Sequence, residues 1–418
     1  MSGWIDRVMA LGRVRPADPS PRIVPISPMA AGVPVTQDSA LTLAAVFACV
    51  RAIAEDIAGL PWLAMQRDRD QREVVYDMDD LLNLSATEEV SAFDFRCALM
   101  GHALTWGNGY AEIVRNGKKQ ARELQIITPD RVEPGRDDLG RLVYSVSQPN
   151  SGARVTIPAE DMFHLRGLSR DGVRGYSIVA QAMLTLGISL AQDSFAASFF
   201  GNGAHPGIAL LTPQKMSSDA IKAMLAQFLG MFGGPRKAGK PIVLDEGTKL
   251  ERITVPPAEA QFLESRNFSV EEICRWFRVP PHKVGHLANA TFSNIEHQGL
   301  DYVTSALLPW CVRLEIEAAR KLCVGYTANR TKLNLAALMR GDSTARSNYY
   351  TRMRQLGAYS VNDIRRMEDL NPIGPEGDVY VMQSQFVPLD KLGQDTKAAP
   401  APQAPDPAAD PTGDQPQE

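Results

Sequence analysis

The sequence predicts an α+β protein in which long amphipathic helices flank short antiparallel strands. Apolar residues recur every three or four positions from about Leu41 to Ala58, which is the period of one helix face. Short apolar runs on both sides of Asn116-Gly117 predict an antiparallel hairpin, because this dipeptide favours a tight turn. Helical spacing returns from Tyr176 to Phe200, a span that is long for a globular helix.

The N-terminal part is expected to form an arm followed by helices and strands. Residues 1–38 are rich in proline and lack periodicity, which is typical of an extended arm. The first helix should end at Gly59. Its apolar face comprises Leu43, Val46, Phe47, Val50, Ile53, Ala54 and Ile57. A second helix is predicted from Ser91 to Thr105, and strands are predicted near Leu142–Val146 and Arg154–Ile157.

A long helix and a compact insertion occupy the middle of the chain. One stripe of the helix consists of Val179, Met183, Leu186 and Leu190. The insertion is expected to contain a strand at Ile208–Leu211, a helix at Ser217–Met231, and strands at Lys240–Leu244 and Lys249–Val255. Helix resumes near Glu259, and Ser269 with Glu272 is expected to form a capping box at a new helix start.

Helical patterns also dominate the C-terminal part. The longest runs from about Asn294 to Cys323, and Pro309 inside it should kink the helix or remove a hydrogen bond near Ser305. A further helical block is expected from about Asp342 to Met367. Residues 391–418, rich in alanine, proline and acidic side chains, are expected to be disordered.

Composition and charge argue against several classes of protein. The 418 residues are 44% hydrophobic and 22% charged, as in soluble globular proteins, and no apolar run is long enough for a membrane span. Residues 394–418 carry five acidic residues and one lysine, a net charge of −4 that equals the total and leaves residues 1–393 neutral. A protein that grips DNA by neutralising phosphates should instead be basic.

The termini and cysteines indicate a reducing compartment. The N-terminus lacks the apolar core of a signal peptide, which points to the cytoplasm. Five widely spaced cysteines form no CxxC pair, so we expect buried free thiols rather than disulfides or zinc ligands.

No motif assembles a catalytic centre. Gly234–Lys240 matches the first seven positions of a nucleotide-binding P-loop, but Pro241 replaces the Ser or Thr that binds magnesium. Because a helix is expected before this loop and a strand after it, the reverse of the P-loop order, a flexible basic loop is favoured. His282 and His286 have a spacing that could present two metal ligands, yet solvated or hydrogen-bonded histidines are favoured. We expect no enzyme activity, cofactor or metal.

Two further patterns have competing interpretations. The arginines between Arg340 and Arg366 could contact DNA, but acidic residues are interleaved with them, so a salt-bridged helical face is favoured. The aromatic residues of Phe195–Phe200 fit either a subunit interface or an internal core, and the sequence does not separate these.

Five sequence blocks follow one another in a particular order. They are Trp106-Gly107-Asn108-Gly109-Tyr110-Ala111; Asp161–Gly167 with Gly175-Tyr176-Ser177; Phe199–Gly203; Val279-Pro280-Pro281; and Gly357–Arg365 with Gly377-Asp378. In this order they resemble the portal proteins of siphovirus-like phages, prophages and gene transfer agents. The resemblance covers about residues 40–390. The chain departs from the family pattern at Arg278, where glycine is common, and at Gly109 and Asp363.

The resemblance implies an elongated portal fold assembled as a dodecameric ring around a DNA channel at one capsid vertex. The chain is expected to begin with an N-terminal arm at 1–38 and to end with an acidic tail at 391–418. Between them, the expected parts are a wing at 39–175, stem helices at 176–203 and 258–280, a clip at 204–257, a tunnel loop at 281–293, a long kinked wing helix at 294–337 and a crown at 338–390.

The resemblance also implies sites and partners. The clip would meet terminase and later the head–tail adaptor, through a docking loop with Arg236, Lys237 and Lys240. The residues implied to face double-stranded DNA, without sequence specificity, are His286, Leu287, Ala288, Asn289, Ala290, Thr291, Phe292 and Ser293. Because residues 285–294 carry no lysine, arginine or acid, they would touch a moving duplex without strong phosphate contacts.

The expected location is a virion or virus-like particle, assembled in the host cytoplasm beside the major capsid protein and without a membrane. Two other functions stay open. One is another ring-forming capsid or adaptor component, and the other is a nucleotide-dependent packaging enzyme built on Gly234–Lys240.

Overall fold

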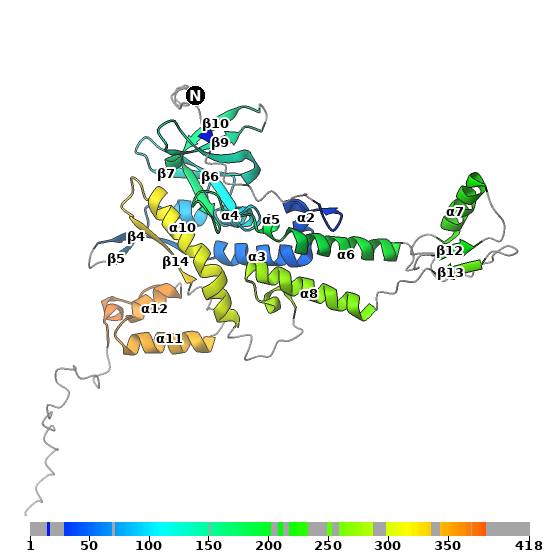
Figure 1. Ribbon diagram of the computed structural model, residues 1–418. Helices are drawn as coiled ribbons and strands as arrows, with labels where there is room; N and C mark the ends of the chain where they lie inside the picture. Colours follow the sequence, from blue (N-terminus) through cyan, green and yellow to red (C-terminus); the bar gives the residue numbers. More distant parts are fainter. Residues whose placement is uncertain are drawn as a thin grey trace, which may run out of the picture. The chain divides into compact units, whose positions relative to one another are not determined.

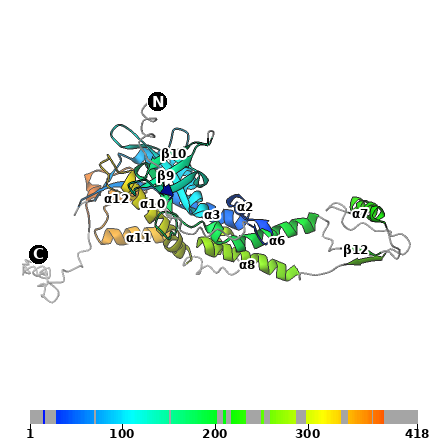
Figure 2. The same cartoon turned by 45° about the horizontal axis from the view of Figure 1, so that its top comes forward.

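Helices and short antiparallel sheets make up the computed structural model, which confirms the α+β prediction (Figures 1 and 2). The described residues are 15–16, 29–68, 72–149, 152–201, 208–211, 217–232, 249–252, 259–286, 298–335, 343–368 and 370–381. Tertiary contacts divide the chain into two units, Met1–Leu338 and Met339–Glu418.

Helix α3 (Ala44–Ala58) lies in the hydrophobic core of the first unit, and the shorter α2 (Gln37–Leu41) precedes it. The buried side chains of α3 include Val46, Val50, Ile53, Ala54 and Ile57. Phe47, expected on the same face, is 53% exposed, so that expectation was wrong. At about 100° per residue, Phe47 lies at the edge of the apolar stripe rather than at its centre.

Helix α4 (Ala92–Trp106) packs against α3 and begins where the sequence predicts, because the Ser91 hydroxyl accepts a hydrogen bond from the Asp94 N–H. The predicted hairpin is also present, as β6 (Asn108–Arg115) and β7 (Ala121–Ile127). Its turn is longer than a two-residue turn: the Asn116 N–H donates to the Gln120 carbonyl, and Lys119 has a left-handed φ of 64°. Strand β11 (Met162–Arg166) pairs with the other edge of β6.

Besides the two-stranded sheet of the insertion described below, three further antiparallel sheets belong to the first unit. One contains β1 (Arg15–Pro16), β8 (Val132–Arg136), β9 (Leu142–Ser147) and β10 (Arg154–Pro158); another contains β14 (Arg330–Leu333), β4 (Trp62–Arg67) and β5 (Arg72–Val75); the smallest contains β2 (Met29–Ala30) and β3 (Val33–Pro34). The predicted strands near Leu142–Val146 and Arg154–Ile157 are thereby confirmed. A π-helical turn at Asp80–Leu84 and 3-10 turns at Pro129–Arg131 and Ala159–Asp161 connect these elements.

Two long helices, α6 (Met183–Gly201) and α8 (Glu259–Phe277), lie side by side, and the short α5 (Ile178–Gln181) leads into α6 (Figures 1 and 2). Gln192 Nε2 donates to Ser265 Oγ at 2.7 Å. Helix α8 is continuous through Ser269, whose hydroxyl donates to the Ser265 carbonyl one turn earlier, so the predicted capping box is wrong. The hydroxyl bonds within the helix instead of accepting at a helix start.

The insertion between α6 and α8 in the sequence contains three described elements. Strands β12 (Ile208–Leu211) and β13 (Lys249–Arg252) pair antiparallel, and α7 (Ser218–Phe232) lies between them in the chain. These elements confirm the α/β prediction for the insertion, while the predicted strand Lys240–Leu244 lies outside the described residues.

The helix predicted around Pro309 is present and irregular where expected. A π-helical turn at Tyr302–Leu307 precedes α10 (Leu308–Lys321), and Pro309 occupies the first turn of α10. Pro309 has no N–H to donate to the Ser305 carbonyl, and a π-helical turn is one way in which a helix accommodates such a missing hydrogen bond. The segment 294–337 also contains β14, so it is not helical throughout.

The described residues of the second unit contain two helices within the helical block predicted for about 342–367. They are α11 (Ser343–Gln355) and α12 (Val361–Met367), followed by a 3-10 turn at Pro375–Asp378. Gly357 has a left-handed φ of 69°, and Ser360 with Asp363 forms a capping box that starts α12.

Candidate functional site

The predicted tunnel loop begins just after α8, and its first residues form a compact turn. Arg278 has a φ of 58° and turns the chain after α8, while the Val279 N–H donates to the Cys274 carbonyl at 3.0 Å. A 3-10 turn at Pro281–Val284 follows and ends at Gly285, whose φ is 82°. A left-handed backbone costs a non-glycine residue about 1 kcal/mol, which accounts for the glycine common at the Arg278 position in the family.

Side-chain contacts fix this turn to three helical segments. The Lys283 ammonium lies 3.6 Å from Asp56 Oδ2 on α3 and 5.1 Å from the ring centre of Tyr302. The Tyr302 hydroxyl donates to the same Asp56 carboxylate at 2.9 Å. His282 Nδ1 lies 2.8 Å from Gln298 Oε1, so the chain entering the loop is bonded to the chain that follows it.

The two histidines of this turn have different partners. His286 Nε2 is 3.7 Å from Glu271 Oε1 on α8, and its side chain is 17% exposed, whereas His282 contacts Gln298. They therefore do not converge on a common metal position. Within the described ranges, no group of three or more His, Cys, Asp or Glu side chains is arranged to hold a metal ion.

A cavity of about 530 Å³ lies beside the turn. Its walls come from the end of α8, the Pro-Pro turn and the described segment from Gln298 onward. They include Glu271, Cys274, Arg275, Arg278, His286 and Asp301. Arg278 also donates to the Ser305 carbonyl at 3.4 Å. Acidic side chains, Glu271 and Asp301, and basic side chains, Arg275 and Arg278, both line these walls.

A second polar centre joins two of the recognised sequence blocks at the start of the α5–α6 helices. Asn108 Oδ1 accepts from the Gly175 N–H at 2.8 Å, and Asn108 Nδ2 donates to the Gly175 carbonyl at 3.0 Å. This pairing fixes the amide orientation. His164 Nε2, 3.1 Å from Asn108 Oδ1, must then donate, and His164 Nδ1 accepts from the Tyr144 hydroxyl at 3.0 Å.

Burial holds this histidine neutral. His164 is 1% exposed, and desolvation, helped by Arg166 and Lys321, lowers its pKa well below 6.5. Its backbone N–H lies 3.4 Å from Glu317 Oε1, and the Glu317 carboxylate pairs with Lys321 at 2.5 Å. The network thus connects β11 to α10.

Glycines allow the close backbone approach at this joint. The Gly167 N–H donates to the Gly107 carbonyl at 2.8 Å. A Cβ on Gly175 would lie 2.0 Å from the same Gly107 oxygen, so no larger residue fits without moving the backbone. The tight packing explains why Gly107 and Gly175 occur together in the resemblance.

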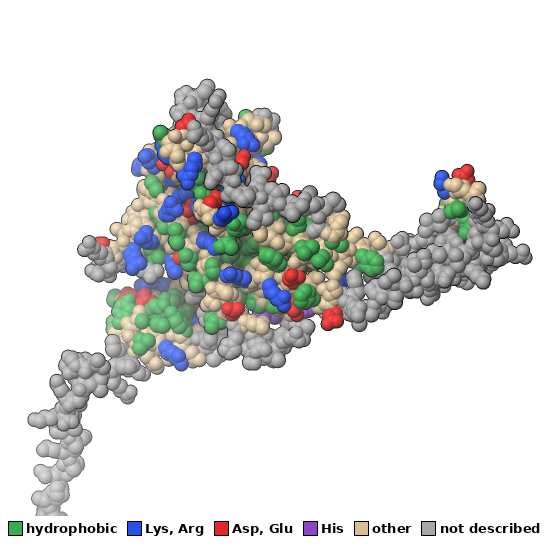
Figure 3. All heavy atoms as spheres, in the orientation of Figure 1, with side chains coloured by type: hydrophobic (Ala, Val, Ile, Leu, Met, Phe, Trp, Pro, Cys, Tyr) green, Lys and Arg blue, Asp and Glu red, His purple; other side chains and the backbone are tan. Residues whose placement is uncertain are grey.

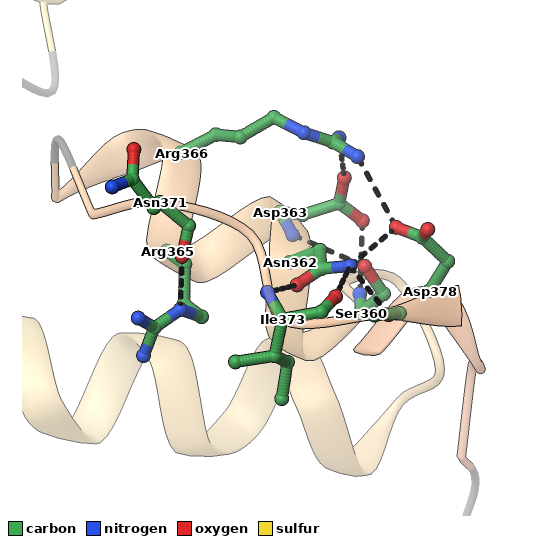
Figure 4. A network of polar contacts seen from close by, with 9 residues as sticks. Ser360, Asn362, Asp363, Arg365, Arg366, Asn371, Ile373 and Asp378 are labelled. Carbon is green, nitrogen blue, oxygen red and sulfur yellow. Dashed lines mark hydrogen bonds and ion pairs between the residues drawn. The ribbon is translucent and has the colours of Figure 1, made fainter. Parts of the chain in front are cut away.

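The second unit contains a comparable network around Asn362 (Figure 4). Asn362 Nδ2 donates to the Ile373 carbonyl at 2.8 Å and to Asp378 Oδ1 at 3.0 Å, and Asn362 Oδ1 accepts from the Ile373 N–H at 2.9 Å. Arg366 bridges Asp363 and Asp378. The sequence block Gly357–Arg365 with Gly377-Asp378 is therefore one hydrogen-bonded assembly.

Two of the described arginines of this unit, Arg346 and Arg366, form ion pairs, as the salt-bridged interpretation expects. Arg366 pairs with two aspartates, Arg346 Nε lies 3.4 Å from Glu368 Oε1, and Arg365 donates to the Asn371 carbonyl at 2.6 Å. Arginines that are paired in this way are less available to form ion pairs with DNA phosphates.

Of the residues predicted to contact DNA, only His286 is described. Leu287–Ser293 lie outside the described residues, as do Arg236, Lys237 and Lys240 of the docking loop and the Gly234–Lys240 motif. The cysteine prediction is confirmed, because Cys49, Cys97, Cys274, Cys311 and Cys323 are all free and all but Cys97 are buried. No helix in the described segments is both long and apolar enough to cross a membrane.

Comparison with known proteins identifies the family. A family model described as phage portal protein matches residues 44–369. The chain belongs to the phage portal protein family. It is 30% identical over 371 residues to the portal protein of Enterobacteria phage HK97, covering 86% of both chains. It is also 30% identical over 364 residues to a probable portal protein of Streptomyces phage phiC31, covering 83% of this chain and 79% of that one.

Solved structures share the fold. A chain from the neck of a native gene transfer agent particle, computed with C12 symmetry, matches with a TM-score of 0.56 and 21% identity, covering 88% of this chain and 99% of that chain. An HK97-family phage portal protein from Corynebacterium diphtheriae matches with a TM-score of 0.56 and 15% identity, covering 74% of this chain and 99% of that one. The portal resemblance seen in the sequence is thereby confirmed.

Proposed function

We propose that twelve copies of this chain form a ring at one capsid vertex, which serves as the channel for DNA packaging and ejection. The observation that carries the proposal is the portal family match over residues 44–369. The chain shares its fold with a component of a particle neck that has C12 symmetry, and this supports a ring of twelve copies. The role is structural, a conduit rather than an enzyme.

Within this ring, the parts of the chain have the roles implied by the family. The wing comprises 39–175 and 294–337, the stem helices 176–203 and 258–280, the clip 204–257, the tunnel loop 281–293 and the crown 338–390, with the arm at 1–38 and the tail at 391–418. The clip, through Arg236, Lys237 and Lys240, docks terminase and then the head–tail adaptor, while the major capsid protein surrounds the ring. Assembly takes place in the host cytoplasm.

Exposed apolar side chains on α6 and α8 support contact between copies. Leu184 and Ile188 on α6 are 68% and 42% exposed, and Phe268 and Trp276 on α8 are 56% and 40% exposed. Apolar side chains are visible on the surface in Figure 3. A cyclic ring joins two different surfaces of each subunit, so the α6 face of one copy packs against the α8 face of the next. Burial of these side chains favours assembly by about 25 cal/mol per Å².

The tunnel loop lets DNA slide because it lacks charge. The compact turn at Arg278–Gly285, bonded to α3 and to Gln298, gives the loop a fixed base. Replacement of Asn289 and Ala290 by lysine would add phosphate contacts and slow DNA passage, whereas replacement of both by glutamine would not. Normal packaging by the lysine variant would contradict the sliding role.

Electron microscopy of the purified chain tests the ring directly. We expect end-on views with twelvefold symmetry and an open centre. Leu184→Asp combined with Ile188→Asp should abolish rings, and Leu139→Asp, at a position 76% exposed on the β8–β9 turn, should leave them intact. Compact monomers that bind and hydrolyse ATP would overturn the proposal in favour of a packaging enzyme.

A further inference from the structure

Two buried cysteines meet where α3 packs against α8. The Sγ atoms of Cys49 and Cys274 are 4.0 Å apart, with the Cys49 thiol donating to the Cys274 sulfur, although 225 residues separate them in the sequence. Both side chains are almost fully buried, at 0% and 2% exposed. A disulfide bond is about 2.05 Å long, so the sulfurs need to approach by about 2 Å to form one.

The cavity beside the loop base gives one of these thiols access to small molecules. Cys274 lies in the cavity wall, next to Arg275 and Arg278. The hydrogen bond from Cys49 lowers the pKa of Cys274, whereas that bond and burial raise the pKa of Cys49. Because the thiolate is the nucleophile, Cys274 is the sulfur that attacks an oxidant first.

We propose that Cys49 and Cys274 are a redox pair that closes to a disulfide when a small peroxide enters this cavity. The Cys274 thiol first loses its proton, and the thiolate attacks one oxygen of hydrogen peroxide. The O–O bond breaks, Cys274 sulfenic acid and hydroxide form, and the hydroxide takes up the released proton as water. The Cys49 sulfur then attacks the Cys274 sulfur, the S–O bond breaks, and the leaving hydroxide takes the Cys49 proton as water. Two thiols are oxidised by two electrons, and one peroxide is reduced to two waters.

The bond would tie α8 to α3 next to the base of the tunnel loop. Cys274 is also the residue whose carbonyl accepts the Val279 N–H after α8, so the crosslink fixes the turn that starts the loop. On the proposed function, the pair stays reduced during assembly in the cytoplasm and oxidises in the released particle, because disulfides persist outside reducing compartments. The chemistry itself does not depend on that function.

Peptide mapping of the full-length chain treated with hydrogen peroxide tests the proposal. After alkylation of free thiols and trypsin digestion, we expect the peptide ending at Arg51 to be disulfide-linked to peptide 267–275. The intact mass should fall by about 2 Da, and the melting midpoint should rise by about 4 °C until a reductant is added. The Cys97→Ser variant, which removes a thiol outside the pair, should behave in the same way.

The outcomes separate the possibilities. Cys49→Ser should stop the mass loss and leave Cys274 as a sulfenic acid that a dimedone probe traps. If that variant does not fold, the peptide map of the wild-type chain alone tests whether Cys49 is linked to Cys274. Crosslinks to other cysteines, or unreacted Cys274 under conditions that oxidise Cys97, would overturn the proposal. Formation of the disulfide by a chain that assembles no rings would refute the proposed function and leave the redox pair standing.

Discussion

The networks around Asn108 and Asn362 use similar chemistry over different lengths of chain. In both, an asparagine amide binds the backbone of another segment beside a closely packed glycine. Asn108 reaches Gly175, 67 residues away, whereas Asn362 reaches Ile373, 11 residues away. The first network therefore holds together distant parts of the first unit, and the second stabilises one short stretch of the second unit.

The difference between the two networks predicts how far the loss of stability extends when each is disrupted. Around Asn108, the network joins the buried side chains of His164 on β11 and Tyr144 on β9 to the backbone of Gly175, just before α5. Around Asn362, the outer contacts are ion pairs of Arg366, whose side chain is 58% exposed. Loss of the first network should destabilise the first unit as a whole, whereas loss of the second should be confined to residues 343–381.

The largest effect is expected from Gly175→Ala. The added methyl would meet the Gly107 backbone oxygen at 2.0 Å and the Gly167 nitrogen at 2.9 Å, and backbone atoms have little room to move. We expect the free energy of unfolding to fall by about 3 kcal/mol, measured by urea denaturation. Gly101→Ala is a matched control on α4, since a Cβ there meets no atom within 4 Å; it should be neutral or stabilising by up to about 1 kcal/mol. Equal stability of the two variants would contradict the close-packing argument.

Asn108→Ala should cost about 2 kcal/mol, because it leaves the Gly175 N–H and carbonyl and the His164 Nε2–H without their partners. Hydrogen exchange followed by mass spectrometry should show faster exchange in α4, β6 and β11 together. A change restricted to the residues beside Asn108 would mean that the network is local, as it is in the second unit.

Asn362→Ala should cost a similar free energy, about 2 kcal/mol, but within a smaller region. We expect faster exchange across 343–381 with no change in α3. Asn371→Ala serves as the control, since its backbone oxygen still accepts from Arg365 when the side chain is truncated. Faster hydrogen exchange in α3 would show that the Asn362 network, like the Asn108 network, affects the first unit, which would contradict the prediction.

Acid should separate the two networks as well. The pKa of His164 is held below 6.5 by burial, so only the unfolded chain binds this proton as pH falls below 6.5, and the stability of the folded state falls with it. Burial alone would raise the pKa of Asp363, but hydrogen bonds from Ser360 and Tyr380 and the charge of Arg366 lower it below its ordinary value of 3.8. The stability that the Asp363 carboxylate contributes is therefore lost only as pH falls below 3.8.

Urea denaturation between pH 7 and pH 5 measures this difference. The free energy of unfolding should decline by up to about 1.4 kcal/mol per pH unit from His164, and His164→Gln should remove that slope. Exchange of residues 343–381 should stay constant over the same range. An unchanged slope in the variant would show that His164 is not the group responsible.

The smallest effect is expected from Arg366→Ala. Its two ion pairs are largely exposed, so the loss should be below about 1 kcal/mol and should shrink further in high salt. Arg352→Ala on the neighbouring helix provides a comparison in the same unit. A loss larger than that of Asn362→Ala would mean that the ion pairs, and not the amide, stabilise this assembly.

Much of the fold could be predicted from the sequence, because periodicity and caps are local signals. Ser91 and the spacing after it predicted α4, and Pro309 predicted an irregular helix there. Errors arose where a local signal was outweighed by context: Ser269 and Glu272 fit a capping box yet lie within a continuous helix, and Phe47 lies at the edge of a face whose orientation only packing decides.

The polar networks could be predicted only in part. The blocks that contain Asn108, Gly175 and Asn362 were recognised by their order, but the bonds between them depend on three-dimensional contacts. His164 lay within a recognised block, and its position in an apolar strand was the available signal of burial. Nothing in the spacing of Cys49 and Cys274 indicated that their sulfurs meet.

The π-helical turn at Tyr302–Leu307 has a consequence for the length of the chain. Such a turn closes its hydrogen bonds over five residues instead of four, so it contains one residue more than an α-helical turn. Deletion of one residue within the turn would convert it to regular α-helix. The buried side chains at its first residue, Tyr302, and beyond it, at Leu314, would keep their present directions. Relatives that differ by one residue in this stretch can therefore keep the same packing on either side.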